Sequence, residues 1–92
     1  MRHFNVAHQG ETLLIKNVSE RTLKLISVTV KYGITVDTLD GQGIRNIGDE
    51  MRLDKDLGSG ESIEIPIKLP DPTSVILVFR DGEIFRREDI SI

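Results

Sequence analysis

Residues 13–33, LLIKNVSERTLKLISVTVKYG, decide the fold. Two runs rich in Leu, Ile and Val, at 13–15 and 23–30, flank the polar heptapeptide KNVSERT at 16–22. Aliphatic and β-branched side chains favour strands, whereas Asn and Ser side chains bond nearby backbone amides and favour turns. The stretch therefore predicts two strands joined by a short polar connection.

The same heptapeptide contains Asn17-Val18-Ser19, which matches the acceptor pattern for N-glycosylation. Three-residue matches are common by chance, and the start of the chain, MRHFNVAHQGE, lacks the apolar segment of a secretory signal. The connecting turn is the favoured interpretation, and glycosylation of Asn17 is left open.

The longest strand candidate is TLKLISVTVKY at 22–32, and its alternation changes phase. Leu23 and Leu25 share one phase, and the next phase contains Ile26, Val28, Val30 and Tyr32. A β-bulge between Leu25 and Ile26 would re-aim the side chains in this way, and it is preferred to a strand buried on both faces.

Alternation is clearest in SIEIPIKL at 62–69, where every second residue is aliphatic. This pattern predicts a half-buried antiparallel strand. Pro66 cannot donate a hydrogen bond to a neighbouring strand, so the strand is expected at a sheet edge, or else with a bulge at Pro66.

The segment SVILVFRDGEIFRRE at 74–88 contains Asp81-Gly82 between two apolar runs. This dipeptide predicts a two-residue hairpin of type I′. The predicted cross-strand pairs are Arg80 with Glu83, Phe79 with Ile84 and Val78 with Phe85, and most of the four aromatic residues are expected in the core.

The pattern loosens between residues 33 and 60. ITVDTL at 34–39 predicts a strand, whereas DGQGIRNIGDE at 40–50 has three glycines and no period; Ile44, Ile47 and Met51 could form one helical turn, although Gly48 weakens it. Counting along the chain gives seven or eight short strands spaced by about ten residues, which is typical of a sandwich. The predicted fold class is all-β, a single antiparallel sandwich domain over residues 1–92.

The order LLIKNVSERTLKLISVTV at 13–30 and LGSGESIEIPI at 57–67 resembles immunoglobulin-like modules of the CARDB and fibronectin-type-III-like kind. In these an Asn-containing turn separates two early strands, and a Gly-Glu-Ser loop opens a later alternating strand. Half of an arrestin-type sandwich is similar too. The chain departs from antibody domains in having no cysteine pair, and it lacks the core Trp. The resemblance implies an immunoglobulin-like scaffold for adhesion, spacing or protein contacts and supplies no catalytic residue.

Composition narrows the function classes further. The chain has 92 residues, a formal net charge of −3 and no cysteine, which excludes disulfides and Cys-type zinc sites and argues against general affinity for nucleic acid. No apolar run approaches the roughly 20 residues of a membrane span. A cytoplasmic protein without membrane insertion is expected, with extracellular residence left open, and abundant Ile without Cys or Trp suggests a thermophilic host.

Candidate site residues are few. His3 and His8 fall on opposite faces of an extended segment, which is poor for shared metal binding. The glycines of DGQGIRNIG lack the order of a phosphate-binding loop. Arg86-Arg87 with Lys24 and Lys31 could form a basic patch, but aromatic stacking residues are scarce. Acidic residues are concentrated in the middle third of the chain: Asp37, Asp40, Asp49, Glu50, Asp54, Asp56 and Glu61.

These observations favour a non-catalytic protein-interaction or structural module, with no enzyme activity, cofactor or metal expected. Residues 75–79 are apolar on both faces, so one face needs a cover: residues 34–57, or another chain. We expect an interaction surface that includes Ile76, Val78 and the strand edge at Pro66, and a homodimer formed through it. The alternatives are a ligand-binding module using its acidic loops for Ca²⁺ and, less favoured, a small OB-like nucleic-acid binder.

Overall fold

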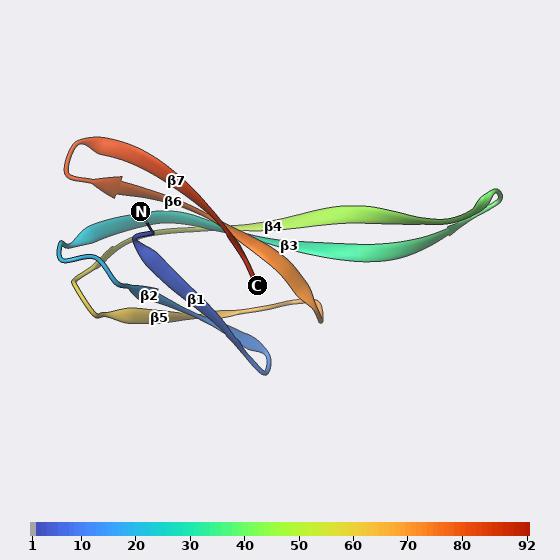
Figure 1. The fold of residues 1–92 in the computed structure, drawn as a ribbon, viewed down its shortest axis with the longest axis horizontal. Coiled ribbons are helices and arrows are strands. Elements are labelled where there is room, and N and C mark those ends of the chain that lie inside the picture. The colour runs from blue at the N-terminus through green and yellow to red at the C-terminus, as the bar shows by residue number, and fades with distance from the viewer. Residues whose placement is uncertain (1) are drawn as a thin grey trace.

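Two antiparallel sheets make up the computed structural model, which describes residues 2–92 except for the side chain of Thr38 (Figure 1). The smaller sheet has the order β1-β2-β5, with β1 at Phe4–Gln9, β2 at Thr12–Asn17 and β5 at Ser62–Pro66. The larger sheet has the order β4-β3-β6-β7, with β3 at Leu23–Thr38, β4 at Gly41–Leu57, β6 at Pro72–Asp81 and β7 at Ile84–Ser91. The predicted all-β antiparallel sandwich is confirmed.

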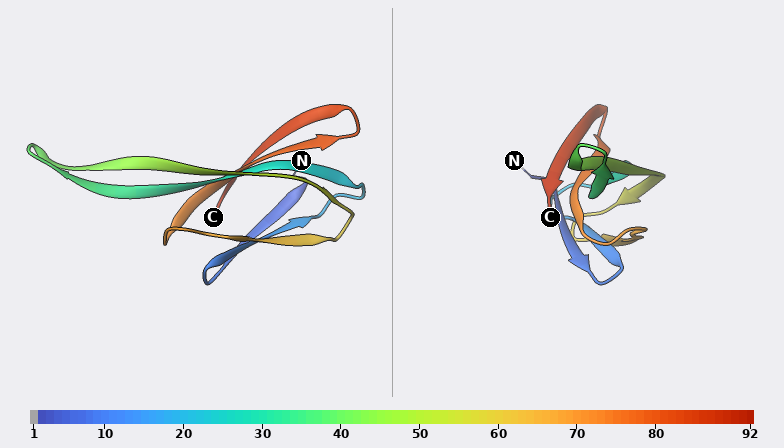
Figure 2. Two further views of the ribbon diagram at one scale, coloured as in Figure 1. Left: turned by 180° about the vertical axis from the view of Figure 1, so that it is seen from behind. Right: turned by 90° about the vertical axis from the view of Figure 1, so that its right-hand side faces the viewer.

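The core lies between the two sheets and takes buried residues from both of them, and the sheets can be followed in Figure 2. It is built by alternate residues of the strands, because successive side chains of a strand point to opposite faces. In β6, for example, Val75, Leu77 and Phe79 are fully buried, while Ile76 and Val78 between them are half-buried on the outer face. The other fully buried side chains include Phe4, Leu13, Ile15, Leu23, Leu25, Val28 and Val30.

The bulge predicted in the strand candidate at 22–32, now part of β3, is confirmed. The pairing of β3 with β6 shifts register between Leu25 and Ser27, which leaves Ile26 as the extra residue of β3. The pairing with β4 shifts at the same place, but there the extra residue lies on β4. Leu25 and Val28 are consequently both buried although they are three positions apart. On the β4 side the irregularity includes Asp54, whose φ of 48° lies in the left-handed region.

The predicted position of the β6–β7 turn is wrong by one residue, and the predicted cross-strand pairs are wrong by two residues. Asp81 pairs with Ile84, so the two turn residues are Gly82 and Glu83. Gly82 has a φ of 62° and Glu83 has no positive φ, which is the type II′ pattern and not type I′. A two-residue slip changes the partner of each side chain of β7 but leaves it on the face that was predicted. Phe85, expected opposite Val78 and in the core, lies opposite Arg80 on the outer face that Val78 shares, and it is 67% exposed.

The segment 33–60, in which the sequence showed no clear period, is instead mostly strand. No helical turn forms at Ile44, Ile47 and Met51, because residues 41–57 make one strand of 17 residues paired with β3. The outer part of this hairpin, residues 33–48, projects from the sandwich and gives the molecule extents of 51 × 27 × 22 Å (Figures 1 and 2). We call residues 33–48 the arm. The segment 34–57 therefore extends the larger sheet and forms no separate layer over Ile76 and Val78.

The strand that contains Pro66 lies at an edge, as predicted. β5 pairs with β2 alone, and Thr12 lies opposite Pro66. The next amide, that of Ile67, donates to the carbonyl of Glu11 on the β2 side. Because successive backbone amides of a strand alternate in direction, the missing N–H of Pro66 falls on the open side, where it disfavours pairing with a further strand.

Candidate functional site

Asn17 is the centre of a buried polar cluster that joins the two sheets. Its side chain is fully buried, and its Nδ2 donates to the carbonyls of Arg21 and Leu57, both at 2.8 Å. Its Oδ1 accepts from the backbone N and the Oγ of Ser19, at 2.9 and 2.7 Å. The amide nitrogen that a glycan would need is thus buried and occupied. KNVSERT is confirmed as a connection, and it carries the chain from β2 in one sheet to β3 in the other.

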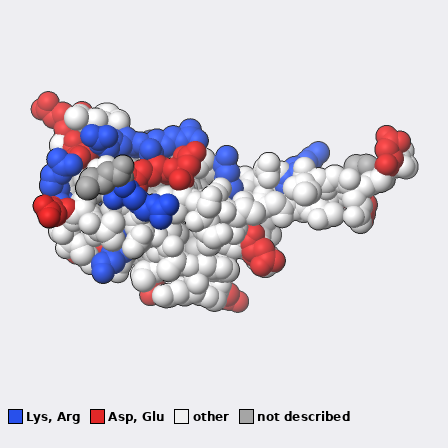
Figure 3. All heavy atoms as spheres, viewed as in Figure 1, with Lys and Arg blue, Asp and Glu red and all other residues white. Residues whose placement is uncertain are grey.

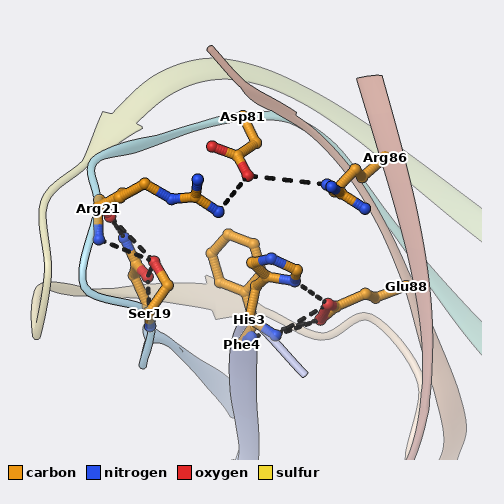
Figure 4. Close-up of polar contacts among 8 residues, drawn as sticks. His3, Phe4, Ser19, Arg21, Asp81, Arg86 and Glu88 are labelled. Carbon is orange, nitrogen blue, oxygen red and sulfur yellow. Dashed lines mark hydrogen bonds and ion pairs between the residues drawn. The ribbon is translucent and has the colours of Figure 1, made fainter. Parts of the chain in front are cut away.

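A second polar contact holds the start of the chain against the last strand (Figure 4). The Glu88 carboxylate, on β7, accepts from the backbone N of His3 at 2.8 and 3.0 Å and from that of Phe4 at 3.3 Å. His3 Nδ1 lies 2.7 Å from Glu88 Oε2, and the His3 ring lies 5.2 Å from the ring of Phe79. Glu88 therefore satisfies amides at the beginning of β1 and links the two sheets.

The third polar group is Asp81, at the end of β6. Its side chain is 8% exposed, Arg21 Nη2 donates to its Oδ2 at 2.6 Å, and Arg86 Nε lies 3.7 Å from the same oxygen (Figure 4). Arg21 is on the β2–β3 connection and Arg86 on β7, so the carboxylate ties the connection to the larger sheet. Since a buried carboxylate is costly unless it is paired, two arginines account for its presence.

His3 and Glu88 have the geometry of a base and its orienting carboxylate, and Ser19 borders the same surface hollow as His3. The Ser19 hydroxyl, however, lies within hydrogen-bond distance of Asn17 Oδ1 and of the Arg21 carbonyl, at 2.7 and 3.0 Å. Within the described part of the chain no contact joins Ser19 to the His3 ring. The arrangement is accounted for as structure, because each of these polar groups has a partner in another element.

The remaining predicted site residues are dispersed. Across residues 2–92, no three Asp, Glu, His or Cys side chains lie close enough together to hold a metal ion. His8 Nε2 lies 2.8 Å from the Gly10 carbonyl in the β1–β2 turn, far along the strand from His3. The glycine-bearing segment expected as a loop is part of β4. Arg87 is paired with Asp89 at 2.8 Å, and this hydrogen bond holds the pKa of Asp89 below its ordinary value.

The expected interaction residues do not form one surface. Ile76 and Val78 lie on the outer face of β6, which is an inner strand of the larger sheet. Their neighbours across the pair to β7 are Asp89 and Arg87, whose ion pair borders them. Pro66 lies on the edge of the other sheet. No helix long and apolar enough to cross a bilayer is present in the described residues.

The arm is the feature that the sequence pattern did not reveal. Ile34 and Val36 share a face with the core residue Tyr32, and Ile47 lies opposite Tyr32 on β4. The core-facing side of the larger sheet thus continues along the arm without the smaller sheet above it (Figure 1). The other arm face is polar except for Ile44. Exposure is 79% for Ile44, 37% for Ile47 and 107% for Leu39 at the tip.

Charge is also distributed differently on the arm and on the sandwich. In the view of Figure 3 charged side chains gather on the upper part of the sandwich, whereas the arm carries few, with acidic atoms at its tip and basic atoms along its length. At the root of the arm, Asp49 Oδ1 lies 3.5 Å from Lys68 Nζ, and its Oδ2 is the one buried side-chain oxygen without a hydrogen-bond partner in the described residues. A ribbon in solvent that exposes apolar side chains and carries only Asp37, Asp40 and Arg45 as charges is the strongest candidate for a binding surface.

Comparison with known proteins found no matching family model, no matching curated protein and no matching solved structure.

Proposed function

We propose that this protein is a non-catalytic, immunoglobulin-like sandwich module that binds another protein chain through its arm. The observation that carries the proposal is the exposure of an apolar two-stranded ribbon beyond the core. A free two-stranded hairpin is marginally stable in water, and large apolar side chains held in solvent oppose folding. A contact that covers the arm removes both penalties.

The strand order supports an immunoglobulin-like scaffold. The first, second and fifth strands form one sheet, and the fourth, third, sixth and seventh form the other. This matches the A-B-E and C′-C-F-G arrangement of such modules, in which the C–C′ hairpin lies at the edge of the second sheet. In this chain the arm is the elongated C–C′ hairpin. Modules of this architecture commonly bind through loops and hairpins that extend from the sandwich.

The polar clusters of the sandwich support a scaffold role for the rest of the chain. Asn17, Glu88 and Asp81 each join elements of different sheets or a connection to a sheet, and each is shielded from solvent. They stabilise the relative position of the sheets from which the arm extends. The proposal thus assigns stability to the sandwich and binding to the arm.

An arm-shortened variant tests this function. Ile34 and Arg45 lie opposite each other, so residues 35–44 can be replaced by Asn-Gly, a favoured two-residue turn, without touching the core. We expect the variant to fold with an unchanged near-ultraviolet spectrum and to lose the complexes that the full chain forms on chemical cross-linking in host extract.

The matched control is Phe85→Ser, which removes another exposed apolar side chain but leaves the arm intact. It should retain the complexes. Retention of every complex by the arm-shortened variant would contradict the proposed function.

A further inference from the structure

The arm has an open strand edge of defined length. β6 pairs with β3 from Lys24 opposite Arg80 to Tyr32 opposite Pro72. Beyond Tyr32, β3 continues for six residues, 33–38, which pair with β4 on one side and with no strand of the described chain on the other. We call this side of residues 33–38 the open edge. It begins where the pairing of β3 with β6 ends, at Tyr32 and Pro72.

The sequence protects most other edges but not this one. β5 carries Pro66, β7 carries the charged run 86–89, and β4 within the sandwich has the irregularity at Asp54. Such devices discourage strand addition. The open edge, by contrast, has the sequence GITVDT, whose Ile, Thr and Val favour strands, and it contains no proline and no bulge. It is suited to accept a further strand.

The strand that fits the open edge best is the same segment of a second copy. Antiparallel pairing about a two-fold axis at Thr35 places Thr35 opposite Thr35, Ile34 opposite Val36, and Gly33 opposite Asp37. Threonine pairs and aliphatic pairs stabilise antiparallel strands, and no like charges meet in this register. The β4 edge of the arm is a poorer candidate, because residues 41–48 include three glycines.

The direction of the added strand is also consistent. β6 runs antiparallel to β3, and a second copy of β3 in the open edge would run antiparallel as well. It would continue the line of β6, with its residue 37 opposite Gly33 and so next to Pro72, which pairs with Tyr32.

We propose that the open edge of the arm pairs with that of a second copy, joining the larger sheets of two molecules into one continuous sheet around a two-fold axis at Thr35. This inference rests on the proposed function, because it names the partner of the arm. Five paired residues at ~3.3 Å each give a contact about 17 Å long, which belongs to the weak class of interfaces. The test is therefore made at high micromolar concentration.

Disulfide formation between single-cysteine variants tests the register, since the chain has no cysteine of its own. In Thr35→Cys the two Cα atoms would lie about 4.5–5.5 Å apart, within the range of a disulfide. Ile44 lies opposite Thr35 on β4, on the same face of the arm, so Ile44→Cys is the matched control. Its two copies would lie three strand spacings apart, roughly 14 Å, which is too far.

We expect mild oxidation to cross-link Thr35→Cys into a dimer and to leave Ile44→Cys monomeric. Preferential cross-linking of Ile44→Cys would overturn the register, and no cross-linking of either variant would overturn self-pairing. In that last case, loss of extract complexes in the arm-shortened variant would still support the proposed function with a different partner. The two proposals therefore fail separately.

Sedimentation equilibrium gives a second measurement that needs no disulfide. Thr35→Asp would place two carboxylates opposite each other and near Asp37 of the other copy, and should weaken self-association at least about tenfold. Ile44→Asp puts the same charge on the far strand and should change it less than about threefold. Equal effects of the two substitutions, or a wild-type chain that stays monomeric at several hundred micromolar, would contradict the proposal.

Discussion

Replacement of Asn17 by Ala should be one of the most destabilising polar substitutions in this chain. The side chain is fully buried and makes four hydrogen bonds, to the connection at Ser19 and Arg21 and to the backbone of Leu57 at the end of β4. Alanine would remove all four, including the buried bond to the Leu57 carbonyl. Water cannot easily replace the amide, because that hydrogen bond lies in the interior.

The magnitude follows from the contacts. Each net hydrogen bond contributes ~1 kcal/mol, and an unsatisfied buried group costs a further ~1–3 kcal/mol. Allowing for the Ser19 contacts that solvent can partly replace, the loss is about 3–4 kcal/mol in the free energy of unfolding. A domain of 92 residues has on the order of 5–14 kcal/mol in total, so the variant would be marginal but measurable.

Urea denaturation followed by circular dichroism measures this difference as a shift in midpoint at constant slope. Asn17→Asp tests the donor and acceptor sides of the amide separately. It keeps an oxygen that accepts from Ser19 but replaces the donating nitrogen with an oxygen that faces two carbonyls. We expect it to be at least as destabilising as Ala. Ser19→Ala is the control for loss of the hydroxyl alone, with an expected cost below ~1 kcal/mol. A cost below ~1 kcal/mol for Asn17→Ala would refute the view that this amide joins the sheets.

Three further predictions concern the core, the turn and metal binding. Phe79→Ala should lower the free energy of unfolding by about 3–5 kcal/mol, because its ring is fully buried and packs edge-on against Phe4 at 4.9 Å; a smaller loss in urea melts would mean that the site collapses around the cavity. Gly82→Val should cost more than ~1 kcal/mol because β-branched residues resist a φ of 62°, and a silent substitution would contradict the turn geometry. Millimolar Ca²⁺ should shift the melting temperature by less than about 2 °C, and a rise of many degrees in calorimetry would reveal a site that the described carboxylates do not form.

Local sequence patterns were sufficient to predict burial where a strand packs one face on the core and leaves the other in solvent. In 62–69 the alternating aliphatic residues predicted the buried Ile65 and the half-buried Ile63 and Ile67. The phase change at Leu25 correctly located the bulge, because a bulge leaves a direct trace in the order of apolar residues. Leu69 was the exception: β5 ends at Pro66, and this side chain is 37% exposed.

The one-residue error at the β6–β7 turn shows what local signals leave undecided. Asp81-Gly82 marks a turn correctly, but both a type I′ and a type II′ turn place glycine in it. The choice depends on Asp81, which is held as part of β6 by Arg21 and Arg86, two residues from other elements. The pair with Arg21 is a contact outside the hairpin, so the register could not be obtained from this segment alone.

The arm was missed for a related reason. Residues 41–48 have low strand propensity, and they form a strand because β3 pairs with them along their whole length. A usable signal was present at Asp40-Gly41, the same dipeptide as at 81–82, next to the β-branched run 34–36. Gly41 has a φ of 128° at the start of β4, which a turn with glycine accommodates. The spacing of Ile44 and Ile47 suggested a helical turn only because the pairing of this segment with β3 cannot be read from the spacing.

Photo-cross-linking in living cells is the most direct test of the claim that the arm is the binding surface. A photoreactive phenylalanine analogue is placed at Val36 on the apolar face of the arm, and in parallel at Val78 on the outer face of β6. Both native side chains are half-buried, so their accessibility is matched. We predict adducts of higher mass from position 36, with this chain or with another protein, and few from position 78. Adducts from position 78 with none from position 36 would place the contact on the sheet face and contradict the account.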